Sequence, residues 1–349
     1  MKKTLQWLVI VSMVGLLGGI GLVVLKQPTP EKKEQIDIGV VLYNAQDPFI
    51  KKTVEYLETY IREIHAETDL AFNLTYKDST HDQSLQNEQI SKLIEEGYDL
   101  LIVNTVERED ASLIIDKAQN VNVPVIFFNR EPVPQDIARW DKLAYVGSKA
   151  EEAGKLQGEL LADALDAGLE VDLNQDGKIQ YVMLEGEYGH QDAILRTYHC
   201  IRTLEQRGYR MENLATDTAM WQRDTAKAKM EEWYTNLGDQ IEVVMANNDE
   251  MALGAIECLK EKGYFEGDKT IPVLGVDGLD EAVKAMEEGT LLGTVLNDSK
   301  EQAKCMLYKI FELLELPMDE TLMPITEKEN QYFWVKHVPL KKHTLEDKK

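Results

Sequence analysis

Residues 172–180, with the sequence DLNQDGKIQ, have the spacing of a calcium-binding loop. Oxygen-bearing side chains stand at the first, third, fifth and ninth positions, namely Asp172, Asn174, Asp176 and Gln180. Gly177 occupies the position where such a loop turns sharply, and Lys178 the position where only a backbone carbonyl is needed. We therefore predict a Ca²⁺ site here, although Asn, Asp and Gly also form plain turns.

The loop does not contain its own bidentate carboxylate. Its twelfth position, where an EF-hand has Glu, is Met183, and residues 180–184 predict a β-strand instead of a helix. The best candidate for the missing carboxylate is Glu242, which opens the later apolar run 242–246. If these runs are neighbouring parallel strands, Gln180 and Glu242 begin at the same sheet edge and lie side by side.

From residue 37 onward, short apolar runs alternate with amphipathic segments. Strands are predicted at residues 38–43, 70–76, 100–104, 123–129, 180–184, 242–246, 273–276 and 294–296. Helices are predicted at residues 49–64, 83–96, 110–120, 149–167, 192–207, 224–236, 250–263, 280–289 and 299–314. This alternation predicts an α/β fold with parallel sheets covered by helices on both faces, in which ligands bind at the carboxyl ends of the strands.

Polar and aromatic side chains gather at those predicted strand ends. They are Asp47, Phe49, Asn129, Arg130, His190, Asp192, Arg196, Asn247, Asn248, Asp249, Asp277, Asn297 and Asp298, with Trp221 in a loop before a helix. Carboxylate, amide and guanidinium groups suit sugar hydroxyls, which both donate and accept hydrogen bonds. Phe49 and Trp221 are candidates for stacking on a pyranose. The calcium loop lies at the opposite strand ends, so we expect the metal to be structural and remote from the ligand.

Several segments resemble those of the bacterial galactose/glucose-binding proteins, the periplasmic receptors of sugar ABC transporters. They are the loop 172–180 and residues 123–132 (VPVIFFNREP), 189–196 (GHQDAILR), 217–221 (DTAMW), 242–249 (EVVMANND), 275–277 (GVD) and 293–298 (GTVLND). The resemblance covers almost everything after residue 37. It implies sugar contacts at Asp47, Phe49, Asn129, His190, Asp192, Arg196, Trp221, Asn248, Asp277 and Asn297. It also implies Ca²⁺ ligands at Asp172, Asn174, Asp176, Lys178, Gln180 and Glu242.

The resemblance further implies a periplasmic-binding-protein-like fold, with two Rossmann-like lobes, a hinge and a ligand cleft between the lobes. We place residues 36–147 and 296–333 in the N-terminal lobe, and residues 148–295 and 334–349 in the C-terminal lobe. A monosaccharide bridging the lobes would stabilise the closed form, which an ABC transporter permease recognises. The carboxylate at Asp47 is expected to accept from O4 of either galactose or glucose, and the receptor is expected to be a monomer.

Residues 1–35 are interpreted as a signal or anchor segment with a linker. Lys2 and Lys3 precede an apolar run over residues 7–25, which is typical of a secretory signal or a single membrane-spanning helix. No Ala-x-Ala cleavage site is evident, which favours an uncleaved anchor. Either interpretation predicts export to the extracytoplasmic face of the envelope, in the periplasm or attached to the membrane.

The formal net charge of −24 argues against nucleic acid as a partner, because binding it depends on Lys and Arg neutralising phosphates. The three cysteines, Cys200, Cys258 and Cys305, are an odd number in helix-like segments. We therefore interpret them as buried thiols and not as a disulfide framework.

The sequence also bears on three other functions. Asp47, Asp192 and Asp277 could imitate the carboxylate pair of a glycosidase, but Arg196 close to Asp192 is expected to keep that carboxylate ionised, so we predict no enzyme activity. A sugar-responsive repressor would need a helix-turn-helix before the first strand, where this chain has an apolar segment. A sensory role, with the loaded receptor signalling to a kinase or chemoreceptor, is the alternative that the sequence leaves open.

Overall fold

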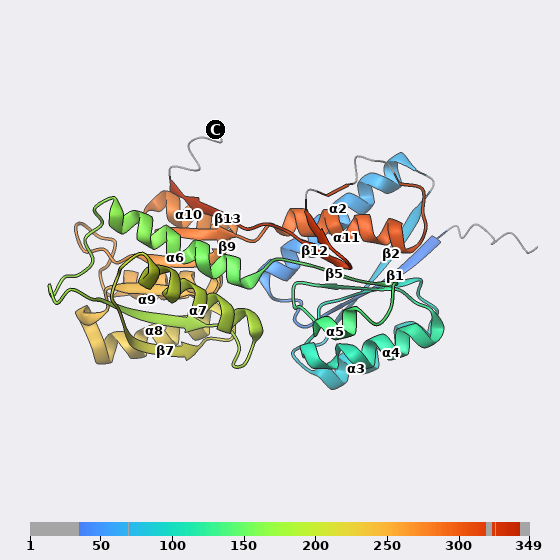
Figure 1. Cartoon of the computed structure of the whole chain (residues 1–349), viewed down its shortest axis with the longest axis horizontal. Coiled ribbons are helices and arrows are strands. Elements are labelled where there is room, and N and C mark those ends of the chain that lie inside the picture. The colour runs from blue at the N-terminus through green and yellow to red at the C-terminus, as the bar shows by residue number, and fades with distance from the viewer. Residues whose placement is uncertain (1–34, 69, 319–322, 325, 343–349) are drawn as a thin grey trace, which may run out of the picture. The chain divides into compact units, whose positions relative to one another are not determined.

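The computed structural model describes residues 35–68, 70–318, 323–324 and 326–342. The predicted signal or anchor therefore lies outside the described residues, as does the end of the predicted C-terminal lobe at 343–349. The described residues from Ile36 onward form one compact unit that contains both sheets (Figure 1). Within the described part of the chain, no helix combines the length and apolar character needed to cross a bilayer.

The N-terminal lobe is built on a seven-stranded sheet in the order β11-β12-β5-β4-β3-β1-β2. Its strands are β1 (Gln35–Leu42), β2 (Ala71–Asp78), β3 (Leu100–Val103), β4 (Val125–Phe128), β5 (Leu143–Gly147), β11 (Glu327–Glu329) and β12 (Tyr332–Trp334). Its helices are α2 (Pro48–Glu67), α3 (Gln83–Glu95), α4 (Ala111–Val121), α5 (Pro134–Ile137) and α11 (Ser299–Leu313), with a 3₁₀ turn η1 (Arg108–Asp110). Strands β1, β3, β4, β5 and β12 pair in parallel, and β11 is antiparallel to β12.

The C-terminal lobe is built on a six-stranded sheet in the order β13-β10-β9-β8-β6-β7. Its strands are β6 (Ile179–Glu185), β7 (Met211–Thr218), β8 (Val243–Ala246), β9 (Val273–Asp277), β10 (Gly293–Leu296) and β13 (Val338–Lys341). Its helices are α6 (Ala150–Asp166), α7 (Gln191–Gln206), α8 (Arg223–Leu237), α9 (Asp249–Glu261) and α10 (Asp280–Glu288), with a 3₁₀ turn η2 (Gly238–Gln240). All strands pair in parallel except β13, which is antiparallel to β10. The predicted α/β fold with two lobes is confirmed.

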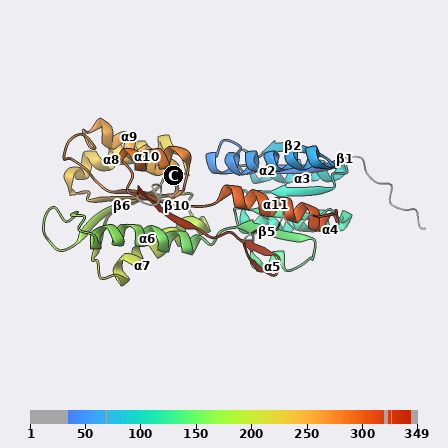
Figure 2. The same ribbon diagram turned by 90° about the horizontal axis from the view of Figure 1, so that it is seen from above.

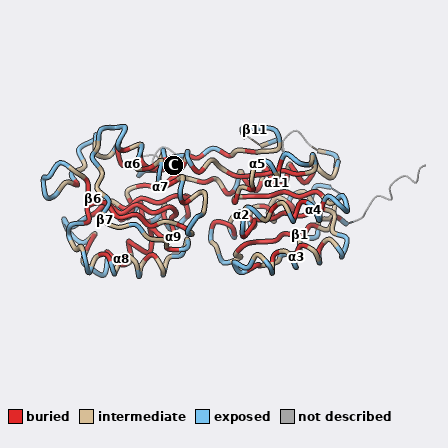
Figure 3. The backbone as a smooth tube through the Cα atoms, turned by 60° about the horizontal axis from the view of Figure 1, so that its bottom comes forward, coloured by how far each residue is buried: buried red, intermediate tan, exposed pale blue. Residues whose placement is uncertain are grey.

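Each sheet buries side chains on both faces, which explains why its strands are continuous apolar runs. In β1, Val40 packs into the core under α2 and α11, whereas the next residue, Val41, packs into the core under α3 and α4. In β8, Val244 faces α8, α9 and α10, whereas Val243 faces α6 and α7. Figure 1 shows α2 and α11 on one side of the N-terminal sheet and α3 and α4 on the other. Figure 2 shows α8, α9 and α10 on one side of the C-terminal sheet and α6 and α7 on the other, and Figure 3 shows the central strands as mostly buried. Because successive side chains of a strand point to opposite faces of the sheet, each lobe has one hydrophobic core on each side of its sheet.

The chain passes between the sheets three times, after β5, after β10 and after β12. The second and third passages lie one residue later than the predicted boundaries. Leu296 pairs with Asp277 inside the C-terminal sheet, and Trp334 pairs with Gly147 inside the N-terminal sheet. The connecting residues are 148–149, 297–298 and 335–337. These three short segments are where a hinge between the lobes has to bend.

The prediction missed the buried strand β5 inside the N-terminal sheet and several strands at or next to the sheet edges. Strand β7, MENLATDT, is only partly buried and carries Asn, Thr and Asp, so it lacks the apolar run that marks the central strands. Strands β11, β12 and β13 are three or four residues long and come from the C-terminal part of the chain, which carries no helical spacer between them. Cys200, Cys258 and Cys305 are buried and free, which confirms their interpretation as thiols.

Candidate functional site

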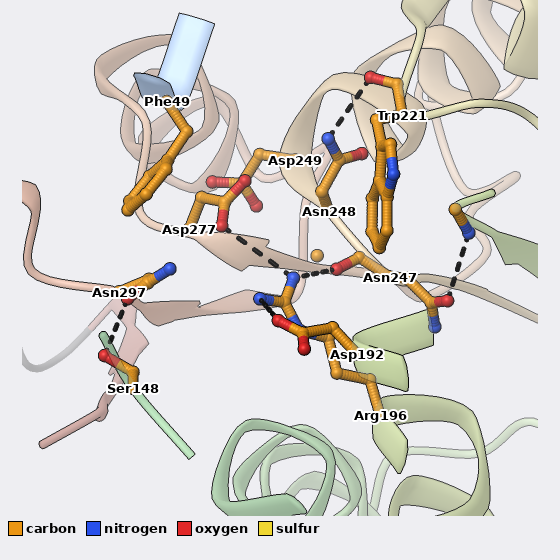
Figure 4. A network of polar contacts seen from close by, with 12 residues as sticks. Phe49, Ser148, Asp192, Arg196, Trp221, Asn247, Asn248, Asp249, Asp277 and Asn297 are labelled. Atoms are coloured by element: carbon orange, nitrogen blue, oxygen red, sulfur yellow. Dashed lines mark hydrogen bonds and ion pairs between the residues drawn. The ribbon is translucent and has the colours of Figure 1, made fainter. Parts of the chain in front are cut away.

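A cavity of about 360 Å³ lies where the carboxyl ends of strands from both lobes meet. It is lined by Tyr43, Asp47, Phe49, Asn129, Arg130, His190, Asp192, Arg196, Trp221, Asn248 and Asp277. Nine of the ten predicted sugar contacts are in this set, and Asn297 is the exception. Figure 4 shows the part of this site that the C-terminal lobe provides, with Phe49 opposite.

Three of the lining residues are also the N-caps of helices that follow a strand. Asp47 Oδ1 accepts from the backbone N–H groups of Phe49 and Ile50, and Pro48 occupies the first helical turn, where its missing N–H costs nothing. Asn248 Oδ1 accepts from the N–H of Met251 at the start of α9. Capping fixes each side chain at a strand end and turns three helix N-termini toward the cavity, where they favour acceptor atoms of a ligand.

His190, the third cap, is held as a neutral donor. Its Nδ1 accepts from the N–H of Asp192 at 3.1 Å, which places the ring proton on Nε2. Burial, followed by the charge of Arg130, lowers the pKa of His190 well below its usual value. The ring therefore offers an N–H donor to the cavity without bringing a positive charge.

Asp47 is fixed by a second interaction that the sequence did not reveal. The hydroxyl of Tyr43 donates to Asp47 Oδ2, and the guanidinium of Arg130 lies over the Tyr43 ring at 3.6 Å. Arg130 in turn donates to the carbonyl of Val106 at 2.9 Å and to Glu187 of the other lobe at 2.7 Å. Burial and the charge of Asp47 raise the pKa of Tyr43, so its hydroxyl remains a donor. Asp47 therefore presents its remaining lone pairs to the cavity in a fixed direction.

Arg196 is the central cation of the C-terminal half of the cavity (Figure 4). Its Nη1 donates to the carbonyl of Asn247 at 2.7 Å and lies 3.9 Å from Asp277 Oδ1, and its Nη2 lies 3.6 Å from Asp192 Oδ2. The last two distances are ion-pair contacts too long for hydrogen bonds. Both carboxylates therefore keep acceptor capacity for hydroxyl groups of a ligand.

The electrostatics of Asp192 differ from the prediction. Arg196 is close to Asp192 as expected, but burial outweighs its charge and raises the pKa of Asp192. Burial likewise raises the pKa of Asp277 well above its usual value, although Arg196 acts in the opposite direction. Desolvation is the dominant effect because both carboxyl groups lie inside the protein. They gain most from a ligand that replaces water with hydroxyl donors.

Trp221 lies against a glycine that its position requires. A Cβ atom on Gly186 would come within 2.0 Å of the Trp221 ring, so only glycine at this turn leaves room for the indole. Trp221 has a left-handed backbone with φ of 61°, and its ring meets the ring of His190 edge to face at 5.3 Å. Asn248 Nδ2 donates to the Trp221 carbonyl at 3.2 Å. The indole is thus held at the cavity in one orientation.

Asn297 lies in the second connecting segment, next to the cavity residues but outside the lining set. Its Oδ1 accepts from Ser148 Oγ at 2.9 Å and from Gln302 Nε2 at 2.7 Å. Its amide nitrogen points toward the centre of the site in Figure 4. The side chain therefore joins the first two connecting segments and turns its NH₂ group toward Asp277. Hydrogen bonding from Asn297 lowers the pKa of Asp277, but burial, which raises it, is the larger effect.

Polar contacts across the cleft hold the two lobes together. Arg130 pairs with Glu187 at 2.7 Å, Gln191 donates to Glu131 at 2.7 Å, and Lys52 pairs with Asp280 at 2.7 Å. The partners in each pair are at least 57 residues apart in sequence. The described conformation is therefore one in which the lobes touch on both sides of the cavity.

The predicted calcium loop is folded as expected at the amino end of β6. Asp172 accepts from the N–H groups of Asp176 and Gly177, and Asp176 accepts from that of Lys178 at 2.9 Å. Glu242 is 3% exposed, and its two oxygens accept from the N–H groups of Leu173 and Gln180 at 2.8 and 2.9 Å. The prediction that Gln180 and Glu242 lie side by side is confirmed, because β6 and β8 pair in parallel from the next residue of each strand onward.

The residues at this loop fit a hard cation that prefers oxygen ligands. The buried carboxylate of Glu242 adjoins the loop from a second strand, which is the place where the missing clamp was expected. Asn174 and Gln180 add amide oxygens, and Lys178 adds a carbonyl. Among the described residues, no three His, Cys, Asp or Glu side chains form a metal cluster by themselves. A Ca²⁺ ion here therefore depends on the amide and carbonyl ligands as well as the three carboxylates.

Sequence reasoning missed Tyr43 and did not assign Arg130 to the cavity. Tyr43 directly follows the apolar run of β1 and is 2% exposed, so it reads as the last core residue of that strand. Arg130 stands in the set of strand-end residues, but its partner Glu187 belongs to the other lobe. The signal that could have found both is their place at the carboxyl ends of strands together with their polar side-chain groups.

Comparisons with known proteins agree with this geometry. A family described as "periplasmic binding protein domain" matches residues 38–316. The chain is 40% identical over 271 residues to the D-galactose/methyl-galactoside binding periplasmic protein MglB of Haemophilus influenzae, covering 77% of this chain and 79% of MglB. This chain belongs to the periplasmic binding protein family. The predicted resemblance is confirmed, and the chain is a solute-binding receptor and not an enzyme.

Relatives within the family are named for different solutes. The xylitol-binding protein of Mycolicibacterium smegmatis is 28% identical, over 86% of this chain and 80% of its own length. A solved ABC transporter solute-binding protein from Bacillus halodurans with bound myo-inositol is 27% identical, with a TM-score of 0.71, covering 90% of this chain and 97% of its own. The solutes in these names are all polyhydroxylated compounds, but each relative is named for a different one.

Proposed function

We propose that this chain is the extracytoplasmic receptor for D-galactose and D-glucose that delivers the sugar to an ABC transporter. The cavity supports this, because fixed carboxylates, amides and a guanidinium surround it and two aromatic side chains line it. Sugar hydroxyls need both acceptors and donors, and a pyranose needs an apolar surface. The 40% identity to MglB makes a hexose the best candidate among the solutes of the relatives.

Ten of the eleven lining residues have a role in this proposal. Asp47, held by Tyr43, accepts from the O4 hydroxyl in either epimer, and Asp192, Asp277 and Asn248 accept from other hydroxyls. Arg196, Asn129 and His190 donate to sugar oxygens. Phe49 from one lobe and Trp221 from the other enclose the ring. Because these residues belong to both lobes, the sugar stabilises the closed conformation through its greater affinity for it.

Delivery follows from hinge closure about the three connecting segments. The closed lobes present to a permease a surface that the open form lacks, so the transporter distinguishes loaded from empty receptor. Asn297 bonds to Ser148, which couples two of the connecting segments to each other. The proposed Ca²⁺ ion, held by Asp172, Asn174, Asp176, Lys178, Gln180 and Glu242, would join the loop before β6 to the start of β8 and stabilise the C-terminal lobe.

Isothermal titration calorimetry tests the proposal. Purified protein is titrated with D-galactose, D-glucose, D-ribose and D-xylose, first in calcium and then after chelation, and the sugars are analysed afterwards for turnover. We expect tight binding of galactose or glucose, weaker binding of the pentoses, and no chemical change. Tighter binding of a pentose than of either hexose would contradict the hexose assignment.

A further inference from the structure

A second cavity, with about 700 Å³ of empty space that is partly open to solvent, adjoins the first. The two cavities share Arg130, His190 and Asp192 as lining residues. The side chains of these three residues therefore form the boundary between them. A ligand group that passes this boundary leaves the proposed hexose site and enters the second cavity.

Asp192 is suited to this boundary position. Its carboxylate lies 3.6 Å from Arg196, beyond hydrogen-bond distance, and its side chain is 14% exposed. It can therefore accept from a hydroxyl on either side. His190, with its proton on Nε2, offers a donor at the same boundary.

The rim of the second cavity carries an aromatic ring that the fold leaves open. Tyr188 is 94% exposed, although it lies beside a polar cavity and not in an apolar surface. The next residue, Gly189, has φ of 75°, a backbone conformation that glycine adopts without strain. An exposed ring of this kind next to hydroxyl-binding groups is suited to stacking on the apolar face of a second sugar.

Charge restricts what the second cavity can accept. Five carboxylates line it, from Glu107, Glu109, Glu131, Glu187 and Asp192, against the two guanidinium groups of Arg108 and Arg130. Arg130 is already paired with Glu187 at 2.7 Å, and Arg108 donates to the carbonyl of Glu131 at 3.1 Å and to Gln191. A phosphate would meet excess negative charge, whereas a neutral sugar ring finds acceptors for its hydroxyls.

We infer that the second cavity is a subsite for a neutral glycosyl substituent, so that the receptor takes disaccharides as well as free hexose. The inference rests on the proposed hexose function, because the first ring occupies the hexose cavity. One ring would lie between Phe49 and Trp221, and the second would lie on Tyr188.

Calorimetry on the full-length protein tests this inference. The ligands are D-galactose, D-glucose, lactose, melibiose, cellobiose and maltose, which cover both epimers and both anomers, and galactose 6-phosphate as the charged control. We expect at least one disaccharide to bind within about tenfold of the better hexose, and the phosphate to bind at least about a hundredfold more weakly. If no hexose binds, the proposed function fails. If a hexose binds but every disaccharide is more than about a hundredfold weaker, the subsite is contradicted.

The variant Tyr188→Ala tests whether Tyr188 stacks on the second sugar or whether the second cavity only has room for that sugar. It is expected to weaken disaccharide binding by about two- to tenfold while leaving hexose affinity unchanged. Tyr198→Ala is the matched control, because Tyr198 is an exposed tyrosine on α7 that lies outside both cavities. An equal loss for hexose and disaccharide in Tyr188→Ala, or no loss for either, would overturn the assignment of Tyr188.

Discussion

The two ends of β6 and β8 carry similar polar residues but are built in different ways. At the amino ends, a contiguous loop and one carboxylate from the next strand form a small cluster, in which Glu242 accepts from the backbone of the loop. At the carboxyl ends, residues from separate strands and from both lobes surround a cavity. The first arrangement belongs to one lobe and suits a structural ion. The second exists only when the lobes meet, so it suits a ligand that controls a conformational equilibrium.

The largest expected effect is at the cavity. Arg196→Met removes the cation next to Asp192 and Asp277 and leaves two buried carboxyl groups without their counter-charge. We expect the free energy of unfolding and the affinity for sugar to fall by a total of about 3–5 kcal/mol, because removing one partner of a buried ion pair costs about that much. Urea unfolding and calorimetry measure the two contributions.

Arg207→Met is the matched control, since Arg207 follows the last turn of α7 and pairs with Asp163 and Asp166 at the surface. A much smaller change is expected there, because both ion pairs are exposed to solvent. Equal effects of the two substitutions would contradict the central place of Arg196.

The second prediction concerns Asp249, which is buried behind Asp277 at the carboxyl end of β8. It accepts from Thr294 Oγ1 at 2.6 Å and from the N–H of Leu279 at 2.8 Å, and burial raises its pKa from 3.8 to about 7. A raised carboxyl pKa means that the folded state binds more protons than the unfolded state between about pH 4 and pH 7. The contribution of Asp249 to stability is therefore lost as the pH rises through this window, by up to about 1.4 kcal/mol per pH unit.

Asp249→Asn removes this titration while keeping an acceptor for Leu279 and a group that can bond to Thr294. The stability of the variant relative to the unsubstituted protein is expected to increase from pH 4 to pH 7, as measured by urea unfolding at each pH. A relative stability that stays constant with pH would show that Asp249 does not titrate in this window.

At the amino end, Glu242→Gln is expected to act on stability and not on the ligand. One of the two oxygens that accept from Leu173 and Gln180 becomes an NH₂ group, which leaves a buried donor unpaired at a cost of about 1–3 kcal/mol. The increase in Tm that calcium produces, relative to the protein in chelator, should also be smaller in the variant. Hexose affinity is expected to stay nearly the same.

Differential scanning calorimetry with and without calcium measures this effect, and Glu170→Gln, an exposed carboxyl beside the same loop, is the control. A large loss of sugar affinity in Glu242→Gln would contradict the separation of the two strand ends.

The effect of Trp221→Ala is expected to be confined to binding. Loss of one stacking face should weaken hexose binding by roughly 1–3 kcal/mol. Calorimetry measures the change, with Trp140→Ala as a control because Trp140 lies in the N-terminal lobe away from the cavity. Unchanged affinity in Trp221→Ala would remove this residue from the site.

The comparison also shows what the sequence could and could not predict. The calcium loop is contiguous, so the spacing from Asp172 to Gln180 was visible directly, and parallel pairing was enough to bring Glu242 to it. Most of the cavity residues follow apolar runs, and the family resemblance, which also covers Trp221, gave nine contacts that line the cavity. Pairs such as Arg130 with Glu187 join segments of different lobes, and no local pattern marks them. The edge strand β7 was missed because it buries only part of its surface and has no apolar run.

The most direct test of the central claim is galactose and glucose calorimetry on two variants, Asp47→Ala in the N-terminal lobe and Asp277→Ala in the C-terminal lobe. If both lobes hold the sugar, the unsubstituted protein binds a hexose and each variant loses at least about tenfold in affinity. Binding that survives unchanged in either variant, or the absence of hexose binding to the unsubstituted protein, would contradict a hexose site shared by the two lobes.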